Sequence, residues 1–221
     1  MSERNRDQTS PEVDGFVSAD GKELVNGAGR SILLRGVGLG SWLLPEGYMW
    51  CMPAGADRPR RIEKLISALI GPEEAVEFWE SYWDRYIAEA DTERIAAEGF
   101  NSVRVPINAR YLTGRDDTAE LLESRVARID QVIEWCRRHR LYVILDLHGA
   151  PGGQTGTNID DSAQDEPALF LDEANQQRTV EIWRSLAERY RDEWIVAGYD
   201  LLNEPLPEWF SRHNPQVLPL Y

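Results

Sequence analysis

Residues 194–205 read WIVAGYDLLNEP, a mostly apolar run that ends in an amide, a carboxyl and a proline. The run predicts a buried strand over residues 194–202. Pro205 disfavours helix for the residue before it, so we expect Glu204 to be extended. An acidic side chain at the end of a buried strand adds nothing to a core. Proton transfer at the rim of a barrel, where such folds keep their active sites, is a better reason for it.

Two strands upstream precede polar residues in the same way. Residues 101–106 are expected to form a short β-branched strand, residues 141–147 are a continuous apolar run, and His148 directly follows the second segment. Amphipathic segments at 119–138 and 172–191 separate the three strands. This alternation of strand and helix is typical of a parallel sheet that is buried on both faces.

The N-terminal part predicts a small hairpin, because Asp-Gly and Asn-Gly between short apolar runs are strong turn signals. The expected strands are 16–18, 23–25 and 31–34, followed by 35–39 as the first strand of the parallel sheet. After a loop rich in Trp, Gly and Pro, helices are expected at 60–70, 73–90 and 92–98.

The predicted fold class is α/β, an incomplete (β/α)8 TIM-barrel type with about four βα units after a small N-terminal β-hairpin. Three of the strands begin near residues 101, 141 and 195. At this spacing eight units need more than about 300 residues, and the sequence has 221. Residues 1–12 are expected to be a polar N-terminal tail, and residues 13–221 the barrel part.

Composition and charge exclude several classes of protein. Hydrophobic residues make up 42% of the chain, which is enough for a core, and the net charge of −14 opposes binding to nucleic acid or anionic membranes. No apolar stretch approaches membrane-spanning length, and residues 1–9 lack the apolar centre of a secretory signal. We expect a cytoplasmic protein, or a secreted one if a leader has been lost. The oligomeric state stays open.

The cysteines and histidines indicate neither a disulfide framework nor a metal site. Cys51 is isolated, and Cys136 lies in a predicted helix, where it is expected to be a buried free thiol. His139, His148 and His213 lie far apart and lack the spacing of metal ligands. We therefore expect no metal and no cofactor.

Polar side chains at three strand ends suggest one site. Arg104, His148, Asn203 and Glu204 should converge if their strands are parallel neighbours. Glycoside cleavage needs a protonated carboxylic acid beside the leaving oxygen, a second carboxylate, and donors that hold the sugar hydroxyls. Glu204 suits the acid, while Asn203 suits a contact to the 2-hydroxyl and His148 a contact to another hydroxyl. Arg104 is permanently charged and could keep a neighbouring carboxylate ionised.

Each of these side chains also has a structural explanation. Arg104 could pair with a structural acid inside the barrel, His148 could be a satisfied core histidine, and Glu204 could be a solvated loop carboxylate. The tripeptide that contains Glu204 is short. It indicates a site only together with the strand before it and with Arg104 and His148 at matching positions on the other strands.

Four ordered segments resemble glycoside hydrolase family 5, the cellulase-type family of retaining β-glycosidases on a (β/α)8 barrel. They are 35–42 with Glu46, 101–106, 146–154 and 202–205. The His-Gly-Ala-Pro-Gly string from His148 and the spacing of Trp42 and Glu46 look closest to the exo-β-1,3-glucanase-like branch. The resemblance implies that residues 13–221 are the N-terminal half of a glycoside hydrolase catalytic barrel.

The resemblance also implies a role for each site residue. Glu204 matches the general acid/base and Asn203 its partner on the 2-hydroxyl, while Arg104 matches the arginine beside the nucleophile. His148 matches the histidine that touches the sugar in subsite −1. Glu46 matches an acid that binds hydroxyls at the non-reducing end, or is a solvated loop charge. The substrate would be a β-linked oligo- or polysaccharide or a β-glycoside, with β-glucan or a related compound expected.

Two acids in the loop 154–162, Asp160 and Asp161, are expected near the same pocket, but neither is assigned a role.

One part of the family pattern has no counterpart. The nucleophilic glutamate should come near the seventh strand, and Glu208 follows Glu204 too closely to replace it. We therefore expect a truncated chain that is inactive alone. The alternatives are a carbohydrate-binding remnant without hydrolysis and a non-functional half-barrel fragment. The sugar, its linkage and endo or exo action are not predicted.

Overall fold

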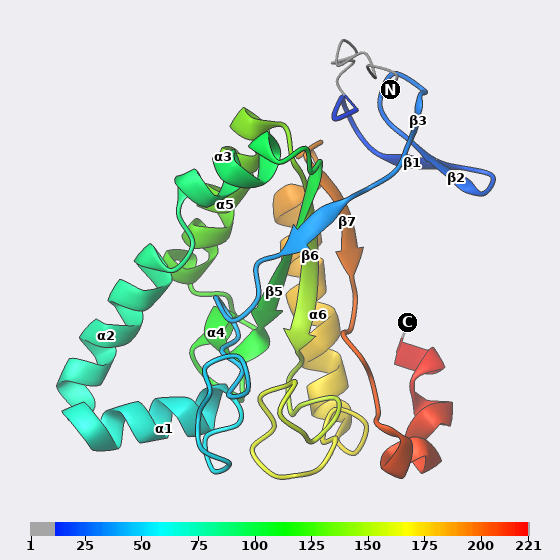
Figure 1. Cartoon of the computed structure of the whole chain (residues 1–221). Helices are drawn as coiled ribbons and strands as arrows, with labels where there is room; N and C mark the ends of the chain where they lie inside the picture. Colours follow the sequence, from blue (N-terminus) through cyan, green and yellow to red (C-terminus); the bar gives the residue numbers. More distant parts are fainter. Residues whose placement is uncertain (1–11, 221) are drawn as a thin grey trace, which may run out of the picture.

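The computed structural model describes residues 12–220 and contains two separate sheets (Figure 1). The antiparallel sheet has the order β1 (Ser18–Asp20), β2 (Glu23–Val25), β3 (Ser31–Ile32). The parallel sheet has the order β4 (Gly36–Gly38), β5 (Ser102–Asn108), β6 (Tyr142–Gly149), β7 (Val196–Asp200). These four parallel strands follow one another in chain order, as in a segment of a (β/α)8 barrel.

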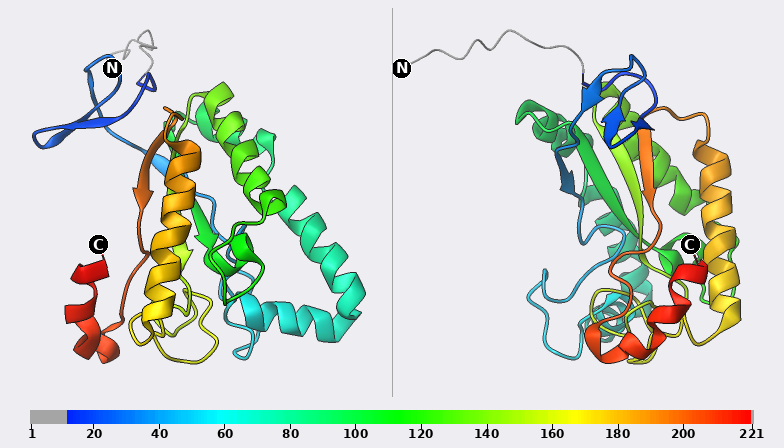
Figure 2. Two further views of the ribbon diagram at one scale, coloured as in Figure 1. Left: turned by 180° about the vertical axis from the view of Figure 1, so that it is seen from behind. Right: turned by 90° about the vertical axis from the view of Figure 1, so that its right-hand side faces the viewer.

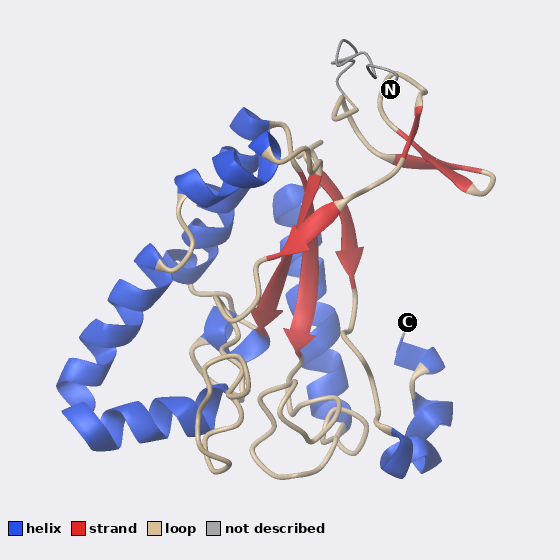
Figure 3. Cartoon of the chain, viewed as in Figure 1, coloured by secondary structure: helices blue, strands red, loops and turns tan. Residues whose placement is uncertain are grey.

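Six α-helices and two short 3₁₀ helices complete the described chain (Figure 3). The α-helices are α1 (Pro59–Ile70), α2 (Pro72–Arg85), α3 (Glu89–Ala97), α4 (Ala109–Thr113), α5 (Glu123–His139) and α6 (Glu173–Tyr190). The 3₁₀ helices are η1 (Glu208–Gln216) and η2 (Leu218–Leu220). None of the described helices is long and apolar enough to cross a membrane.

The helices cover one face of the parallel sheet (Figure 2). On β5 and β6 the alternate residues Val103, Val105, Val143 and Leu145 are at most 1% exposed and belong to the main core. Arg104, between the two core valines of β5, is only partly buried, because successive side chains of a strand point to opposite faces. Helices cover one face, and the other face carries polar groups (Figure 2). On that second face Ser102 and Asp146 are buried and Arg104 is partly buried, so the expected burial of both faces is confirmed in part for β5 and β6.

The two long helices form where the sequence predicted them. In α5, Val126, Ile129, Val132 and Ile133 recur at helical spacing and are all buried against the core. Cys136 on the same face is a buried free thiol, as expected, and burial raises its pKa to about 12.

The start of α6 is set by a local cap. Asp172 accepts a hydrogen bond from the backbone N–H of Ala174, which satisfies one of the free donors at the helix start.

Differences from the predicted elements lie mainly at loops and ends. The short helix α4 was not predicted; Asn108 starts it by accepting a hydrogen bond from the N–H of Arg110. Strand β7 ends at Asp200, and η1 and η2 follow in a stretch where no element was expected. Of the predicted polar tail, residues 1–11 lie outside the described residues.

Glu204 is not extended, because its φ is 39°. The backbone turns here because the peptide groups on both sides of Glu204 are hydrogen-bonded to Gln154. The carbonyl of Asn203 accepts from Gln154, and the N–H of Leu206 donates to the Gln154 carbonyl. These tertiary hydrogen bonds override the local preference that Pro205 imposes.

Candidate active site

The carboxyl ends of the parallel strands meet the long loops of the chain at one end of the sheet (Figure 3). His148 lies near the end of β6, and Asn203 and Glu204 lie in the loop after β7. Arg104 is the third residue of β5 and not at its end, because the strand continues to Asn108. Its long side chain still reaches the residues that follow β7, so the structure brings Arg104, Asn203 and His148 together.

Arg104 is the centre of a network of charged and polar groups. Its Nε and Nη2 donate to Asp200 Oδ2 at 3.0 and 2.8 Å. Nη2 also donates to Asn203 Oδ1 at 2.8 Å and lies 2.9 Å from Asp146 Oδ2. The guanidinium therefore joins three strands and holds the Asn203 amide in one orientation. The structural explanation for Arg104, a pair with an acid inside the barrel, thus describes part of what it does.

Asp146 is the buried anchor of this network. It is fully buried, and its Oδ2 lies 2.7 Å from His148 Nδ1 as well as close to Arg104. Burial raises the pKa of Asp146, and the hydrogen bond to His148 and the charge of Arg104 oppose this rise. Its second oxygen, Oδ1, has no hydrogen-bond partner among the described residues.

The contacts with Asp146 and Arg104 determine which atoms of His148 and Asn203 can donate or accept a hydrogen bond. Because a carboxylate only accepts, the short contact with Asp146 places the ring proton on His148 Nδ1 and leaves Nε2 as an acceptor. Since Arg104 donates to Asn203 Oδ1, the Nδ2 end of that amide faces His148 Nε2, at 3.4 Å. The distance is long, so the Nδ2 donor is not strongly committed to His148 and can bind an oxygen of a ligand.

Glu46 reaches the same site from the loop after β4. Its Oε1 lies 3.8 Å from His148 Nε2, and the residue is 5% exposed, so the alternative of a solvated loop charge is wrong. Burial raises the pKa of Glu46, while His148 and a hydrogen bond from Tyr48 oppose the rise. The negative charge of Glu204 adds to the rise.

Glu204 itself is exposed, unlike its neighbour Asn203, which is 7% exposed. An exposed carboxyl beside a buried, oriented amide can exchange protons with a bound ligand and with water.

The side chain of Gln154 fixes the backbone beneath the site. Its Nε2 donates to the carbonyls of His148 at 2.7 Å and Asn203 at 2.9 Å, and its Oε1 accepts from the N–H of Ala150. Gln154 is fully buried, so these bonds are shielded from water. It holds the end of β6 against the loop that follows β7.

Several of these residues were not predicted as part of the site. Asp146 stands two positions before His148, and residues at this spacing share a face of a strand, so the pattern could have revealed it. Asp200 offered a weaker signal as an acid near the end of a strand. Gln154 and Tyr48 lie in loops, where sequence spacing says little about spatial contact.

The loop acids Asp160 and Asp161 do structural work. Asp160 accepts from the N–H groups of Thr155, Gly156 and Ser162, which closes its own loop. Asp161 pairs with Arg110, contacts Arg60 and caps the start of α1. Among residues 12–220, no group of three or more His, Cys, Asp or Glu side chains is arranged to hold a metal ion.

Comparisons with known proteins place this geometry in a family context. The profile of the cellulase family, glycosyl hydrolase family 5, matches residues 70–219. A beta-xylosidase of Phanerodontia chrysosporium is 31% identical over 198 residues, which are 89% of this chain and 41% of the relative. A probable glucan 1,3-beta-glucosidase A of Neosartorya fischeri is 33% identical over 177 residues, or 78% of this chain and 41% of the relative. The chain thus spans about two fifths of the length of these relatives.

Solved structures show the same fold. The rutinosidase of Aspergillus niger has a TM-score of 0.64 at 16% identity, covering 84% of this chain and 57% of that chain. An endogalactoceramidase has a TM-score of 0.63 at 20% identity, covering 94% of this chain and 48% of that chain. The parallel sheet described above therefore matches part of a larger structure in each case.

Proposed function

Because the chain belongs to glycosyl hydrolase family 5, we propose that Glu204 is the general acid/base of a retaining β-glycosidase site. The proposed substrate is β-glucan or a related β-glycoside, as the names of the beta-xylosidase and glucan 1,3-beta-glucosidase relatives suggest. The proposal is supported most directly by the hydrogen bond from Arg104 to Asn203 Oδ1. This bond leaves the Nδ2 donor of Asn203, one residue before Glu204, available at the carboxyl ends of the strands.

In this mechanism each polar group acts on a different part of the sugar. Asn203 Nδ2 donates to the 2-hydroxyl, and His148 Nε2 accepts from a neighbouring hydroxyl. Glu204 gives its proton to the glycosidic oxygen as the bond breaks, and later takes a proton from the attacking water. Glu46, buried beside His148, binds a hydroxyl at the non-reducing end.

A retaining reaction also needs an ionised carboxylate about 5–5.5 Å from the acid. Among the described residues, the other carboxyl groups near Glu204 are unsuited to this role. Asp146 and Asp200 hold Arg104, and burial raises the pKa of Glu46, which disfavours its ionised form. We therefore propose that the nucleophile is not among residues 12–220, and that the 221-residue chain binds sugar without hydrolysing it.

A ligand that reports on the acid tests the role of Glu204 without needing the nucleophile. Glucoimidazole is a glucose analogue with a basic nitrogen in place of the glycosidic oxygen, so a correctly placed acid should bind it more tightly than glucose. Calorimetry should show this preference in the wild-type chain, and Glu204→Gln should remove roughly 1.5–3 kcal/mol of it, the value of a charged hydrogen bond. The Glu208→Gln variant is the matched control, since Glu208 lies in η1 and has no assigned role.

Two results would contradict the proposal. If Glu204→Gln binds glucoimidazole as tightly as wild type does, Glu204 is not the acid. If the purified chain hydrolyses aryl β-glucosides and Glu204→Gln abolishes the reaction, Glu204 is the acid but the chain is not inactive alone.

A further inference from the structure

The backbone around Glu204 adopts a conformation that its own residues do not favour. The φ of Glu204 is 39° and that of Leu206 is 60°, so two residues other than glycine have left-handed backbone on either side of Pro205. Such conformations persist only where the surrounding structure enforces them, and they cluster at functional sites. Contacts from outside this segment must therefore hold Glu204 in place.

Gln154 makes these contacts on both sides of Glu204. The carbonyl of Asn203 accepts a hydrogen bond from Gln154 Nε2 at 2.9 Å, and the N–H of Leu206 donates to the Gln154 carbonyl at 3.2 Å. Pro205 has no N–H and cannot add a hydrogen bond of its own. One residue thus holds the turn that carries Glu204 at its two ends.

The same side chain also holds the backbone that carries His148. Its Nε2 donates to the carbonyl of His148 at 2.7 Å, and its Oε1 accepts from the N–H of Ala150 at 3.1 Å. The amide group therefore uses both donor hydrogens and its acceptor oxygen on backbone partners. Among side chains, only Gln and Asn offer this combination of groups.

Two glycines turn the chain so that Gln154 lies beneath the strand ends. Gly152 and Gly153 both have a φ of 79°, and a Cβ on either would overlap a neighbouring side chain. Gln154 itself is fully buried, so a ligand cannot touch it and water does not compete for its hydrogen bonds. It can act on a ligand only through the residues that it holds.

We propose that Gln154 is a positioning residue of the candidate active site. It imposes the left-handed backbone of Glu204, which sets the direction of that carboxyl, and it fixes Glu204 relative to His148. The inference rests on the proposed role of Glu204 as the acid/base. A purely structural role for Gln154 predicts a loss of stability alone, whereas a positioning role also predicts changes at residue 204 and in ligand preference.

Backbone chemical shifts of Glu204 test the first part without any ligand. In the labelled wild-type chain the Cα and Cβ shifts of Glu204 should be those of left-handed backbone. Gln154→Met keeps an unbranched side chain of similar length and removes the three side-chain hydrogen bonds. In this variant the shifts should move to extended values, which Pro205 favours for the residue before it.

Asn101→Leu is the matched control, because Asn101 is a comparable buried amide at the opposite end of the sheet. Asn101 directly precedes β5, whereas Gln154 follows β6. Its Nδ2 donates to the Leu33 carbonyl and the Glu12 carboxylate, and its Oδ1 accepts from the N–H of Arg35. The control should lower the free energy of unfolding, but leave the Glu204 shifts unchanged.

Calorimetry with glucoimidazole and glucose tests the consequence for the site. Gln154→Met should reduce the preference for glucoimidazole by roughly 10-fold or more, because the carboxyl of Glu204 no longer faces the basic nitrogen. Asn101→Leu should keep the preference. Glu204→Gln is measured alongside: if it keeps the preference, the proposed role of Glu204 fails, and the chemical shifts still decide whether Gln154 positions residue 204.

Three results would overturn the positioning role. Glu204 could keep left-handed shifts in Gln154→Met, Gln154→Met could keep the preference that Glu204→Gln loses, or Asn101→Leu could lose the preference to the same extent. Should Gln154→Met fail to fold, Gln154→Asn takes its place, since an amide that is one methylene shorter cannot reach all three backbone partners. Unchanged Glu204 shifts in that variant would overturn the proposal as well.

Discussion

Replacing Arg104 by methionine should expose how strongly the buried network depends on one guanidinium. Methionine keeps an unbranched chain of similar length and removes every hydrogen bond. The side chain of Asp146 is completely buried, and after the change its one remaining polar contact among the described residues is with His148. The expected loss in the free energy of unfolding can be estimated separately for each partner of Arg104.

The largest part of the loss comes from Asp146, because its buried carboxylate loses the ion pair with Arg104, which should cost roughly 1.5–3 kcal/mol. The acceptor on Asn203 adds about 1 kcal/mol. The pair with Asp200 adds less than about 1 kcal/mol, because the two side chains are 30% and 38% exposed and water screens them. Together the free energy of unfolding should fall by roughly 2.5–5 kcal/mol, in line with removing one partner of a buried ion pair.

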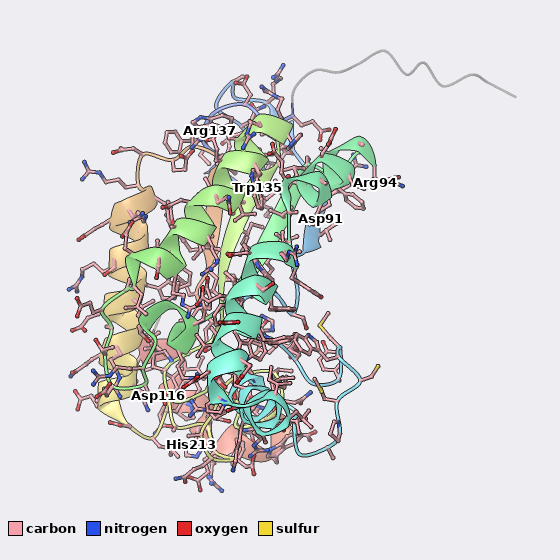
Figure 4. The ribbon with its side chains drawn as sticks, turned by 90° about the vertical axis from the view of Figure 1, so that its left-hand side faces the viewer. Asp91, Arg94, Asp116, Trp135, Arg137 and His213 are labelled. Carbon is pink, nitrogen blue, oxygen red and sulfur yellow. The ribbon has the colours of Figure 1, made fainter. Side chains whose placement is uncertain are left out.

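Urea unfolding followed by tryptophan fluorescence measures this loss, with Arg94→Met as the matched control. Arg94 is exposed on α3 (Figure 4), and its pair with Glu98 at 2.7 Å should contribute at most about 0.5 kcal/mol. The double variant Arg104→Met/Asp146→Asn should recover at least about 1 kcal/mol, since it removes the buried unpaired charge.

The pH dependence supplies a further check on the same variant. Without Arg104 the pKa of Asp146 should rise further above its ordinary 3.8, since the charge of Arg104 lowers it. A carboxyl with a raised pKa in the folded state loses stability as pH rises through that range, so the penalty should be larger near pH 7 than near pH 4. A loss below about 1 kcal/mol, or a double variant no more stable than Arg104→Met, would show that the buried carboxylate of Asp146 does not depend on the guanidinium of Arg104.

Three other changes test the surroundings of the site. Burial raises the pKa of Glu46 above 4.5, so the folded chain should lose stability as pH rises past that value, and Glu46→Gln should lessen this loss. Urea unfolding of both proteins at about pH 4 and pH 8 measures the effect, and an equal change in stability for the two proteins would contradict it. Glu204→Gln should change the free energy of unfolding by less than about 0.5 kcal/mol, because the side chain is exposed; a larger change in thermal unfolding would mean that Glu204 supports the fold. Gly47→Ala should cost about 1–3 kcal/mol, because its Cβ would overlap the backbone oxygen of Ala56; an unchanged urea midpoint would show that the loop carrying Glu46 can shift freely.

The sequence predicted the strands and long helices because their signals are local. Residues 101–106 were expected to form a β-branched strand, and residues 141–147 and 194–202 are apolar runs of strand length. All three form parallel strands, with shifted ends. The polar residues after them could be placed at one end of the sheet by the parallel arrangement alone. The family motifs were also readable in the sequence, and the match over residues 70–219 confirms the family.

Contacts between distant loops could not be read in this way. The sequence spacing did not show that Glu46 would be buried beside His148, or that Gln154 would join the end of β6 to the loop after β7. The positive φ of Glu204 also went against its local preference, since hydrogen bonds to Gln154 outweigh the effect of the following proline.

By itself the sequence determined the order of strands and helices and the identity of the groups at the strand ends, because periodicity and motif order are properties of the chain. The tertiary structure alone decided which partner each group has: Asp146 and Asp200 for Arg104, Arg104 for Asn203, and no acceptor within residues 12–220 for the indole of Trp79. The physical reason is that hydrogen bonding and burial depend on distances between segments far apart in the chain, and sheet register and helix packing set those distances.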